Sequence, residues 1–323
     1  MAEFYAQLDC PVSVACTGAA VVDVLVRAPR TLPAPGESKI VDAISLAPGG
    51  CGINTAIGLA RLGVDVSFWA RLGADGAGDF LRNQLEGHRV RLDNWQQSPE
   101  RTTKSAVVLV SESGERAFLR TSGGGNALSL DDFEHAEWSG IRHLHVGGCY
   151  SLRRLLDVDL AQALRLARAY GVTTSVDTVW SHDDNWDTLL PALPWVDHLL
   201  PSLAEARRLT GEQDPEAICA WLHGRGVTTV VVKLGARGAF FSTTQDRAAS
   251  PAFAVPGGRV VDTTGAGDAF CAGYIAALQV GRPLPEAVRW ANAWAAIAVS
   301  ALGATTALHD REQLMDRLEE GVI

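Results

Sequence analysis

Short runs of β-branched and other apolar residues alternate with helix-like stretches along most of the chain. The expected strands are short and apolar throughout, and they cover residues 12–16, 64–70, 142–146, 172–176, 198–200 and 228–233. The expected helices have apolar positions three or four residues apart, and they cover residues 52–62, 158–170, 203–209 and 215–224. Such alternation is typical of βαβ units joined by right-handed crossovers. We therefore expect an α/β fold with a mostly parallel sheet that helices cover on both faces.

Two stretches interrupt this alternation. Residues 22–46 are extended and contain the turn-forming segment Pro33–Gly36, and residues 104–120 are predicted to form a hairpin around Ser113-Gly114-Glu115. Neither stretch has helical periodicity, so we expect antiparallel strands set apart from the main sheet as a small β lid. No internal repeat, low-complexity run or linker divides the chain. Residues 1–323 are therefore predicted to form one domain that includes the lid strands.

Composition and charge disfavour several classes of protein. The 323 residues are 47% hydrophobic and 20% charged, which is enough apolar material for a substantial core, and the formal net charge is −9. A negative balance argues against a surface for nucleic acid or for an anionic membrane. The apolar stretch Trp290–Ala304 is shorter than the roughly 20 residues that span a bilayer, so a buried helix is expected there.

The cysteines and the first residues favour a cytoplasmic protein. The six cysteines are scattered without a CxxC pair, which disfavours a zinc site or a disulfide framework and fits reduced thiols. The opening stretch MAEFYAQLDCP has no basic region followed by an apolar run, so no signal peptide is expected.

The most informative run is Val261–Phe270, with the sequence VDTTGAGDAF. Its glycines allow a tight turn and a close approach to a ligand, and a helix-like stretch over 269–279 follows. The N–H groups of Ala266, Gly267 and Asp268 would then lie at a helix N-terminus, where an anion is favoured. A carboxylate beside that pocket could take a proton from a hydroxyl during phosphoryl transfer. The alternative is an ordinary capped helix, and the run matches neither the P-loop nor the G-x-G-x-x-G pattern.

A second glycine-rich run precedes an expected helix. The stretch Ala47–Gly63, with the sequence APGGCGINTAIGLARLG, places Gly49, Gly50 and Gly52 before the helix and Asn54 in its first turn. Asparagine is a poor residue for a helix interior, but its amide can bond a ligand hydroxyl. An asparagine that merely lies near a helix cap is the alternative.

Together the two runs resemble both signature regions of the ribokinase-like, phosphofructokinase-B-type (PfkB) carbohydrate kinases, in the same order. Residues 72–80 (LGADGAGDF), Thr210-Gly211 and 302–304 (LGA) are similar to further parts of that family, and the resemblance covers roughly residues 12–318. It implies a ribokinase-like three-layer α/β/α fold with a small antiparallel β lid. It also implies ATP as the phosphoryl donor, Mg²⁺ as cofactor and a sugar as acceptor.

The resemblance assigns the chemistry to the later run. Asp268 matches the catalytic base that accepts the proton of the acceptor hydroxyl. Gly265, Ala266 and Gly267 match the anion hole for the transferring phosphoryl group. An aspartate with an unperturbed pKa of about 3.9 is ionised at neutral pH and is a weak base, so orienting the hydroxyl would be its main contribution.

For the acceptor, the resemblance implies contacts from Asp23, Gly49, Gly50 and Asn54. Asp23 follows Gly18 by five positions, as in the family's early sugar-binding element, and its carboxylate would accept bonds from two hydroxyls. An exposed acidic residue in a loop is the alternative for Asp23.

For the nucleotide, Lys233, Gly235 and Gly238 resemble a phosphate loop that follows a late strand. Asn292 matches a helix position near the adenine. An exposed lysine at a strand end and a satisfied core amide are the alternatives for Lys233 and Asn292.

Two metal sites follow from the resemblance. Asp262 and Thr264 resemble positions that hold a monovalent cation such as K⁺ in some members. The family's N-x-x-E motif for Mg²⁺ is represented by Ser202 and Glu205, with serine in place of asparagine. Because a serine hydroxyl can hold a water, Glu205 is expected to act on Mg²⁺ through water.

The identity of the acceptor is less defined. Val21 and Cys51 stand where ribokinases have Asn and Lys, which disfavours ribose. The stretch 175–184 (SVDTVWSHDD) lacks the arginine of fructokinases and ketodeoxygluconate kinases, although Asp177 and Trp180 could still shape the pocket. No cation for an acidic sugar is evident there, so a neutral sugar or sugar-like acceptor is expected.

The leading hypothesis is an ATP-dependent kinase for a primary hydroxyl of a neutral sugar. A nucleoside kinase of the same fold is the first alternative. A catalytically silent sugar-binding sensor is supported only by Ser202 and is opposed by the retention of Asp268. An NAD-dependent oxidoreductase ranks last because the first strand lacks a Rossmann fingerprint. Exposed edges of the lid strands would favour a homodimer.

Overall fold

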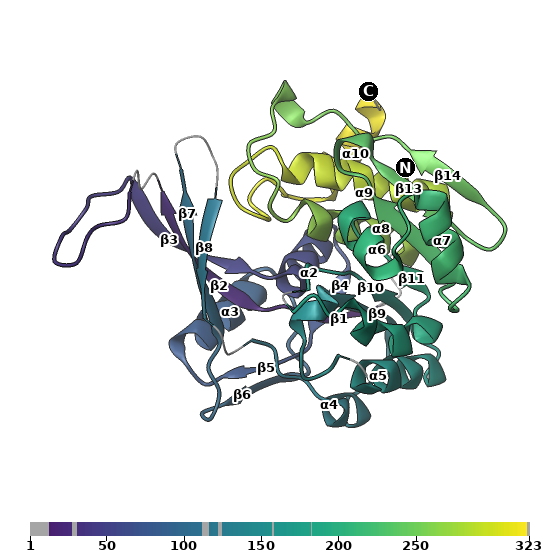
Figure 1. Cartoon of the computed structure of the whole chain (residues 1–323), viewed down its shortest axis with the longest axis horizontal. Helices are drawn as coiled ribbons and strands as arrows, with labels where there is room; N and C mark the ends of the chain where they lie inside the picture. The colour runs from purple at the N-terminus through teal and green to yellow at the C-terminus, as the bar shows by residue number, and fades with distance from the viewer. Residues whose placement is uncertain are drawn as a thin grey trace.

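The chain forms a main body from which a lid of strands projects at one side (Figure 1). The structure is a computed structural model that describes residues 13–27, 31–111, 116–121, 125–156, 158–181 and 183–321. Val12 at the start of the first expected strand and the expected turn Ser113-Gly114-Glu115 lie outside these residues.

The main body is built on an eight-stranded sheet. In chain order its strands are β1 (Ser13–Gly18), β4 (Asp65–Phe68), β9 (Ile141–Gly147), β10 (Thr173–Val176), β11 (His198–Leu199), β12 (Thr229–Lys233), β13 (Ala239–Ser242) and β14 (Arg247–Ser250). The spatial order is β14-β13-β12-β11-β10-β9-β1-β4. All neighbours from β4 to β12 pair in parallel, whereas β13 and β14 add antiparallel pairs at one edge. The expected mostly parallel sheet is confirmed.

Helices cover both faces of this sheet, as the alternating side chains of β1 illustrate. Val14 and Cys16 face one hydrophobic core, and Ala15 faces the other. The first core contains α2 (Cys51–Arg61), α8 (Ala266–Gln279), α9 (Leu284–Ala298) and α10 (Arg311–Glu320). The second contains α4 (Leu130–Glu134), α5 (Val158–Ala169), α6 (Leu203–Thr210), α7 (Pro215–His223) and the 3₁₀ segment η3 (Trp186–Trp195). The expected three-layer α/β/α order is therefore confirmed.

Local sequence signals set where the helices begin. Asp214 caps α7 by accepting hydrogen bonds from its first turn, and Asp75 does the same for α3 (Gly76–Gly87). The helices α2 and α8 begin instead after Gly50 and Gly265, whose φ angles are 95° and 74°. Among the described residues, no side chain caps either helix. Their first-turn N–H groups are therefore candidates for bonding a ligand.

The stretch Trp290–Ala304 is helical only in part. Its first residues belong to the buried helix α9, which ends at Ala298. Within the part of the chain that the structure describes, no helix has both the length and the apolar character needed to cross a membrane.

The lid is a four-stranded sheet in the order β3-β2-β7-β8. It consists of β2 (Val21–Arg27), β3 (Ala43–Gly49), β7 (Lys104–Val110) and β8 (Arg116–Arg120). Both expected segments pair internally as antiparallel strands, and β2 and β7 join them through a parallel pairing that the sequence did not indicate. The parallel pairing arises because each of the two segments leaves the main body by its first strand, as Figure 1 shows.

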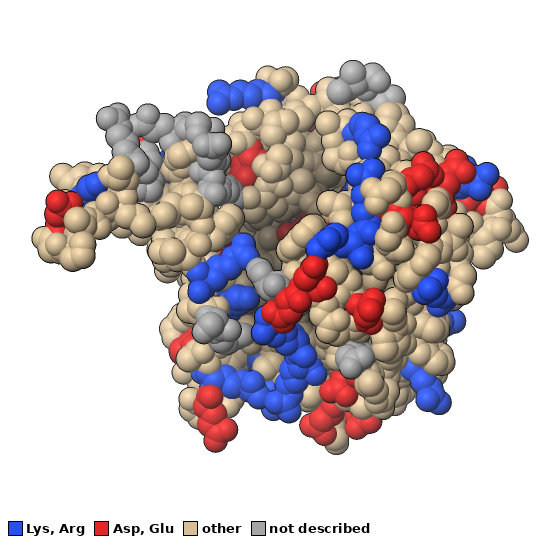
Figure 2. All heavy atoms as spheres, in the orientation of Figure 1, with Lys and Arg blue, Asp and Glu red and all other residues tan. Residues whose placement is uncertain are grey.

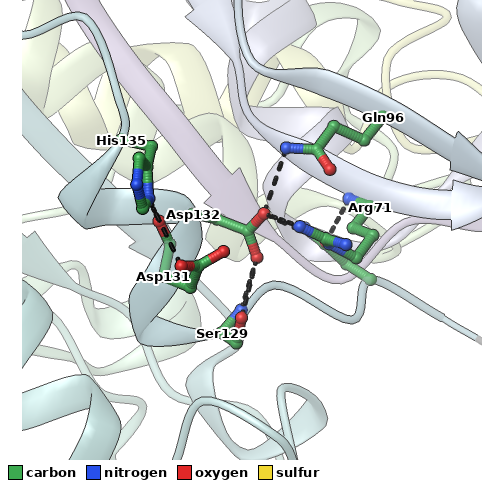
Figure 3. Close-up of polar contacts among 7 residues, drawn as sticks. Arg71, Gln96, Ser129, Asp131, Asp132 and His135 are labelled. Carbon is green, nitrogen blue, oxygen red and sulfur yellow. Dashed lines mark hydrogen bonds and ion pairs between the residues drawn. The ribbon is translucent and has the colours of Figure 1, made fainter.

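A polar cluster around the buried carboxylate of Asp132 anchors the chain that returns from the lid (Figure 3). Asp132 of α4 accepts hydrogen bonds from Arg71 of β5 (Ala70–Gly73), from Gln96 of β6 (Trp95–Ser98) and from Ser129. Burial alone would raise the pKa of Asp132, but the hydrogen bonds from Arg71 and Ser129 hold it below its usual value. The carboxylate is therefore ionised at neutral pH and joins three separate segments.

Asn126 links this cluster to the main sheet. Its Oδ1 accepts a hydrogen bond from the N–H of Arg71 at 3.0 Å, and its Nδ2 donates to the carbonyl of Gly18 at 3.1 Å. Gly18 ends β1, so the segment that follows β8 is fixed to the edge of the sheet where the candidate site lies.

Three histidines lie within the sheet, of which His143 and His145 are buried and His198 is partly buried. His143 and His145 of β9 bond the hydroxyls of Thr173 and Ser175 at 2.7–2.8 Å. His198 of β11 has its Nδ1 2.9 Å from a tyrosine hydroxyl of α8. Burial lowers the pKa of all three, to about 3 for His145 and about 4 for His198.

We predict that the free energy of unfolding decreases as pH falls below about 6.5, the ordinary histidine pKa. These three histidines bind protons there in the unfolded chain and not in the folded chain, so each of them removes up to about 1.4 kcal/mol per pH unit. Urea unfolding between pH 7 and pH 5 measures the effect. His198→Gln should lessen the slope, and the exposed His309→Gln should leave it unchanged. A free energy independent of pH over this range would contradict the prediction.

Candidate active site

A cavity of about 490 Å³ lies between the lid and the carboxyl ends of the parallel strands, where α/β proteins bind ligands. Figure 2 shows the corresponding hollow between the projecting lid and the main body. Many of the residues expected at the site line this cavity. They are Asp23, Gly50, Asn54, Glu205, Lys233, Gly235, Thr264, Gly265, Gly267 and Asp268.

Glycines let the start of α2 lie directly against the ends of two strands. A Cβ at Gly52 would lie 2.8 Å from the Cα of Gly18, and a Cβ at Gly147 would lie 2.9 Å from the nitrogen of Gly52. A Cβ at Gly50 would lie 2.4 Å from the carbonyl oxygen of Ala19. Side chains at these positions would push α2 away from the sheet, so the glycines hold its first turn over the strand ends.

The two glycine-rich runs meet at a single buried hydrogen bond. Asn54 in the first turn of α2 donates from Nδ2 to Oδ2 of Asp268 at 2.8 Å. Asn54 is 5% exposed and Asp268 is 7% exposed, so the hydrogen bond is buried. The helices come this close because Gly58 of α2 lies against Ala272 of α8, where a Cβ would be 2.8 Å from the alanine methyl group.

The surroundings of Asp268 make it a stronger base than an ordinary aspartate. Burial raises its pKa, while the hydrogen bond from Asn54 and the charge of Lys233 act in the opposite direction. The Cys51 thiol also hydrogen-bonds Asp268, and burial together with the nearby carboxylates raises the pKa of that thiol well above its usual value. The thiol therefore stays protonated and acts as a donor.

The start of α8 offers an anion site beside Asp268. Gly265 adopts a left-handed conformation, and a Cβ there would lie 2.5 Å from the methyl group of Ala304. The N–H of Ala266 donates to the carbonyl of Thr263 at 3.3 Å. Among the described residues, Gly267 and Asp268 are thus the first-turn donors that remain for an anion.

Lys233 is buried in an ion pair. Its Nζ lies 2.6 Å from Oδ1 of Asp177, and the two side chains are 13% and 3% exposed. A Cβ at Gly267 would lie 3.2 Å from the same Nζ, so the ammonium group also lies against the start of α8. Burial alone would lower the pKa of Lys233, but Asp177 raises it above its usual value, and the lysine stays charged.

Asp177 is a central residue of the site, although the sequence indicated only that it could shape the pocket. It directly follows β10, and its N–H donates to the carbonyl of Val146 in β9 at 2.9 Å. Burial raises its pKa, and Lys233 opposes that shift. The position of an acidic residue directly after a buried parallel strand is the signal that identifies it.

Ser202 and Glu205 form a capping box at the start of α6. Oε2 of Glu205 accepts hydrogen bonds from the N–H of Ser202 at 3.0 Å and from the hydroxyl of Thr178 at 2.8 Å. All three residues line the cavity. Their carboxylate and hydroxyl oxygens are the kind of donors that Mg²⁺ prefers, so the residues present fit that ion.

A second group with metal-ligand atoms is less suitable. Atoms of Cys51, Asp177 and Asp268 lie within 4.8 Å of one another. Mg²⁺ favours oxygen over a thiol, and Asp177 is already paired with Lys233.

Some expected site residues lie outside the cavity lining. Asn292 donates to the carbonyl and hydroxyl oxygens of Ser250 at 3.3 Å and 3.0 Å, which joins α9 to β14. A Cβ at Gly238 would lie 2.0 Å from the carbonyl oxygen of Ser250. Both residues thus support the end of the sheet through the same partner.

Asp262 and Gly49 support residues of the lining. Asp262 accepts from the N–H groups of Thr264 at 2.9 Å and Gly303 at 2.7 Å, so it braces the turn before α8. A Cβ at Gly49 would lie 2.2 Å from Oδ2 of Asp23. Gly49 therefore leaves space for the Asp23 carboxylate.

The lid contributes two cations that the sequence reasoning missed. Lys104 of β7 and Arg120 of β8 line the cavity. The expectation that the pocket presents no cation rested on residues 175–184 alone, of which Asp177, Thr178 and Val179 reach the lining. Trp180 is 48% exposed and is not part of it. Basic residues on the strands of an expected lid were the available signal.

We predict that Lys233→Met and Asp177→Asn each destabilise the protein by about 3–5 kcal/mol, because each leaves a buried charge without its partner. The double variant should be destabilised by less than the sum of the single effects. Urea unfolding of the four proteins measures this coupling. Strictly additive effects would show that the pair does not interact.

Known proteins are similar to this chain in fold and in sequence. The family model for pfkB family carbohydrate kinases matches residues 12–311. A ribokinase of Haemophilus influenzae is 29% identical over 293 residues, covering 88% of this chain and 92% of that protein. A 2-dehydro-3-deoxygluconokinase of Bacillus subtilis is 29% identical over 285 residues, which cover 85% of this chain and 87% of that protein. The structure of the Arabidopsis thaliana ribokinase complexed with ribose and ATP matches with a TM-score of 0.79 at 27% identity. The match covers 96% of this chain and 99% of that chain. The chain therefore belongs to the PfkB family of carbohydrate kinases.

Proposed function

We propose that the protein transfers the γ-phosphoryl group of ATP to a hydroxyl of a sugar, with Asp268 as the catalytic base. The observation that carries this proposal is the buried contact between Asn54 and Asp268 beside the start of α8. A proton acceptor and an anion site then border the same cavity.

In the proposed reaction, Asp268 orients the acceptor hydroxyl and accepts its proton as the oxygen bonds to the γ-phosphorus. The bond from that phosphorus to the bridging oxygen breaks at the same time, and ADP leaves with the electron pair. The N–H groups of Gly267 and Asp268, with the ammonium group of Lys233, stabilise the charge on the transferring group. The raised pKa of Asp268 favours the proton transfer.

Binding of the two substrates is divided between the lid and the main body. Asp23 and Gly50 border the acceptor, with Gly49 behind Asp23. Gly235, in the turn after β12, borders the phosphates, and Gly238 and Asn292 act indirectly by supporting the nucleotide side.

Glu205, Ser202 and Thr178 would hold Mg²⁺ through water. The ion would neutralise charge on the phosphates. K⁺ at Asp262 and Thr264 is a further proposal, supported by the buried carboxylate that braces the turn before α8.

We predict that Asp268→Asn lowers kcat by about 10²–10⁴-fold, because the amide cannot accept the proton. The dissociation constants for ATP and for the acceptor should change little, since asparagine has nearly the same shape and size as aspartate. Coupled measurement of ADP release with ribose, fructose, adenosine and inosine as acceptors tests this and separates a sugar kinase from a nucleoside kinase. The exposed Asp246→Asn is the matched control. An unchanged kcat in Asp268→Asn would refute the role of this carboxylate.

We further propose that two copies associate through their lids. The edge strands β3 and β8 carry the exposed apolar residues Ile44, Leu46 and Leu119, which are 67%, 54% and 56% exposed. Edge strands with apolar side chains favour pairing with another chain.

We predict that light scattering of the parent protein gives twice the mass of the chain and that Leu46→Lys shifts it toward the monomer. Val158→Lys replaces an equally exposed apolar residue on α5 and should keep the dimer. A monomeric parent protein at micromolar concentration would contradict association through the lid.

A further inference from the structure

The lid face that borders the cavity carries a pair of positive charges. Lys104 pairs with Val21 across the parallel β2–β7 seam, and Arg120 of β8 lies opposite Ala106, which in turn pairs with Asp23. Alternate residues of a strand share a face, so these five side chains point to the same side of the lid sheet. All five residues line the cavity.

Both cations contact neighbouring groups that carry no charge. Among the described residues, neither Lys104 nor Arg120 forms an ion pair. The guanidinium group of Arg120 lies 4.6 Å from the ring centroid of Phe118, another cavity residue. The stem of Lys104 passes the backbone of Gly125, where a Cβ would lie 3.8 Å from the lysine Cδ.

The local electrostatics agree with an unneutralised positive site. Burial lowers the pKa of Lys104, and the charges of Arg120 and Arg153 lower it further. Figure 2 shows basic side chains gathered on the molecular face below the lid. An anion placed between these cations would relieve the repulsion among them.

The lining of the cavity differs in charge between its two sides. On the main-body side, Asp177, Glu205 and Asp268 outnumber Lys233, whereas on the lid side Lys104 and Arg120 outnumber Asp23. A neutral sugar would displace water from the two cations without replacing their hydration by a counter-charge, which is unfavourable. A sugar with a hydroxyl at one end and an anionic group at the other matches both sides.

We propose that the acceptor carries an anionic group, a carboxylate or a phosphate, which Lys104 and Arg120 bind while its hydroxyl faces Asp268. The proposal rests on the proposed kinase function and replaces the neutral acceptor expected from the sequence. The planar fork of Arg120 can bond two oxygens of such a group, and Lys104 adds a second charge.

Calorimetric binding without nucleotide tests the proposal independently of turnover. The probes are D-fructose, D-fructose 6-phosphate, D-gluconate and 2-dehydro-3-deoxygluconate. At least one anionic probe should bind about tenfold or more tightly than D-fructose, as expected for hydrogen bonds between charged groups. Comparing the affinities for the two carboxylates with the affinity for the phosphate then identifies which anion the site binds. Higher salt should reduce the preference, because screening weakens partly exposed charge pairs.

Variants that remove or retain the charge of Arg120 and Lys104 test whether these two residues cause the preference for an anion. Arg120→Leu and Lys104→Met should each reduce the ratio of anionic to neutral affinity by about tenfold. Arg120→Lys and Lys104→Arg should retain part of it. Arg82→Leu removes an equal charge from the exposed face of α3, where Arg82 pairs with Glu86, and should leave the ratio unchanged. Circular dichroism of each variant checks folding.

Three results would overturn the proposal. The first is that D-fructose binds as tightly as the anionic probes or more tightly. The second is that the preference for the anionic probe persists in both Arg120→Leu and Lys104→Met. The third is that these two variants lose affinity for ATP while their preference among acceptors is unchanged. The last result would assign the cations to the nucleotide. If a neutral sugar is phosphorylated without any anion preference, this proposal fails and the kinase function stands. If the preference is present but no probe is ever phosphorylated, the anion site stands and the proposed function fails.

Discussion

The whole site depends on the close approach of the first turns of α2 and α8 at one edge of the sheet. This approach allows the hydrogen bond between Asn54 and Asp268. The contact joins residues 214 positions apart in the chain. It requires glycine where α2 meets β1 and β9, and again where α2 meets α8. Both helices begin after glycines with positive φ angles, so backbone donors and the carboxylate of Asp268 are brought to the same cavity.

Buried charge is the second constraint. Asp177 and Lys233 lie side by side at the ends of β10 and β12, and the ammonium group also reaches the start of α8. Placing a paired lysine there adds a cation beside the anion site without leaving a buried charge unpaired. The lid then adds Lys104 and Arg120 from the opposite side, so cations border the cavity on both sides.

Much of the architecture could be predicted from local patterns. Alternating apolar runs indicated the parallel sheet, and the absence of helical periodicity in residues 22–46 and 104–120 indicated the lid. The parallel seam between β2 and β7 could not be predicted, because it joins two segments that the pattern presents as separate hairpins.

Residues of the candidate site could be predicted to lie together where one local run contains them, as in Gly265–Asp268 at the cavity, and less so where partners come together only on folding. Lys233 alone has the pattern of a lysine at a strand end, and only the fold brings Asp177 to it. Strand register likewise brings Lys104 and Arg120 onto one face.

The central claim is that the cavity transfers a phosphoryl group from ATP to a sugar hydroxyl at Asp268. Phosphorus NMR of the protein with Mg·ATP and the panel of neutral and anionic sugars tests it most directly. The account predicts a new phosphomonoester signal that grows in equal amount with ADP and is lost in Asp268→Asn. ADP formed only together with inorganic phosphate, or a phosphomonoester that forms equally fast in the variant, would contradict it.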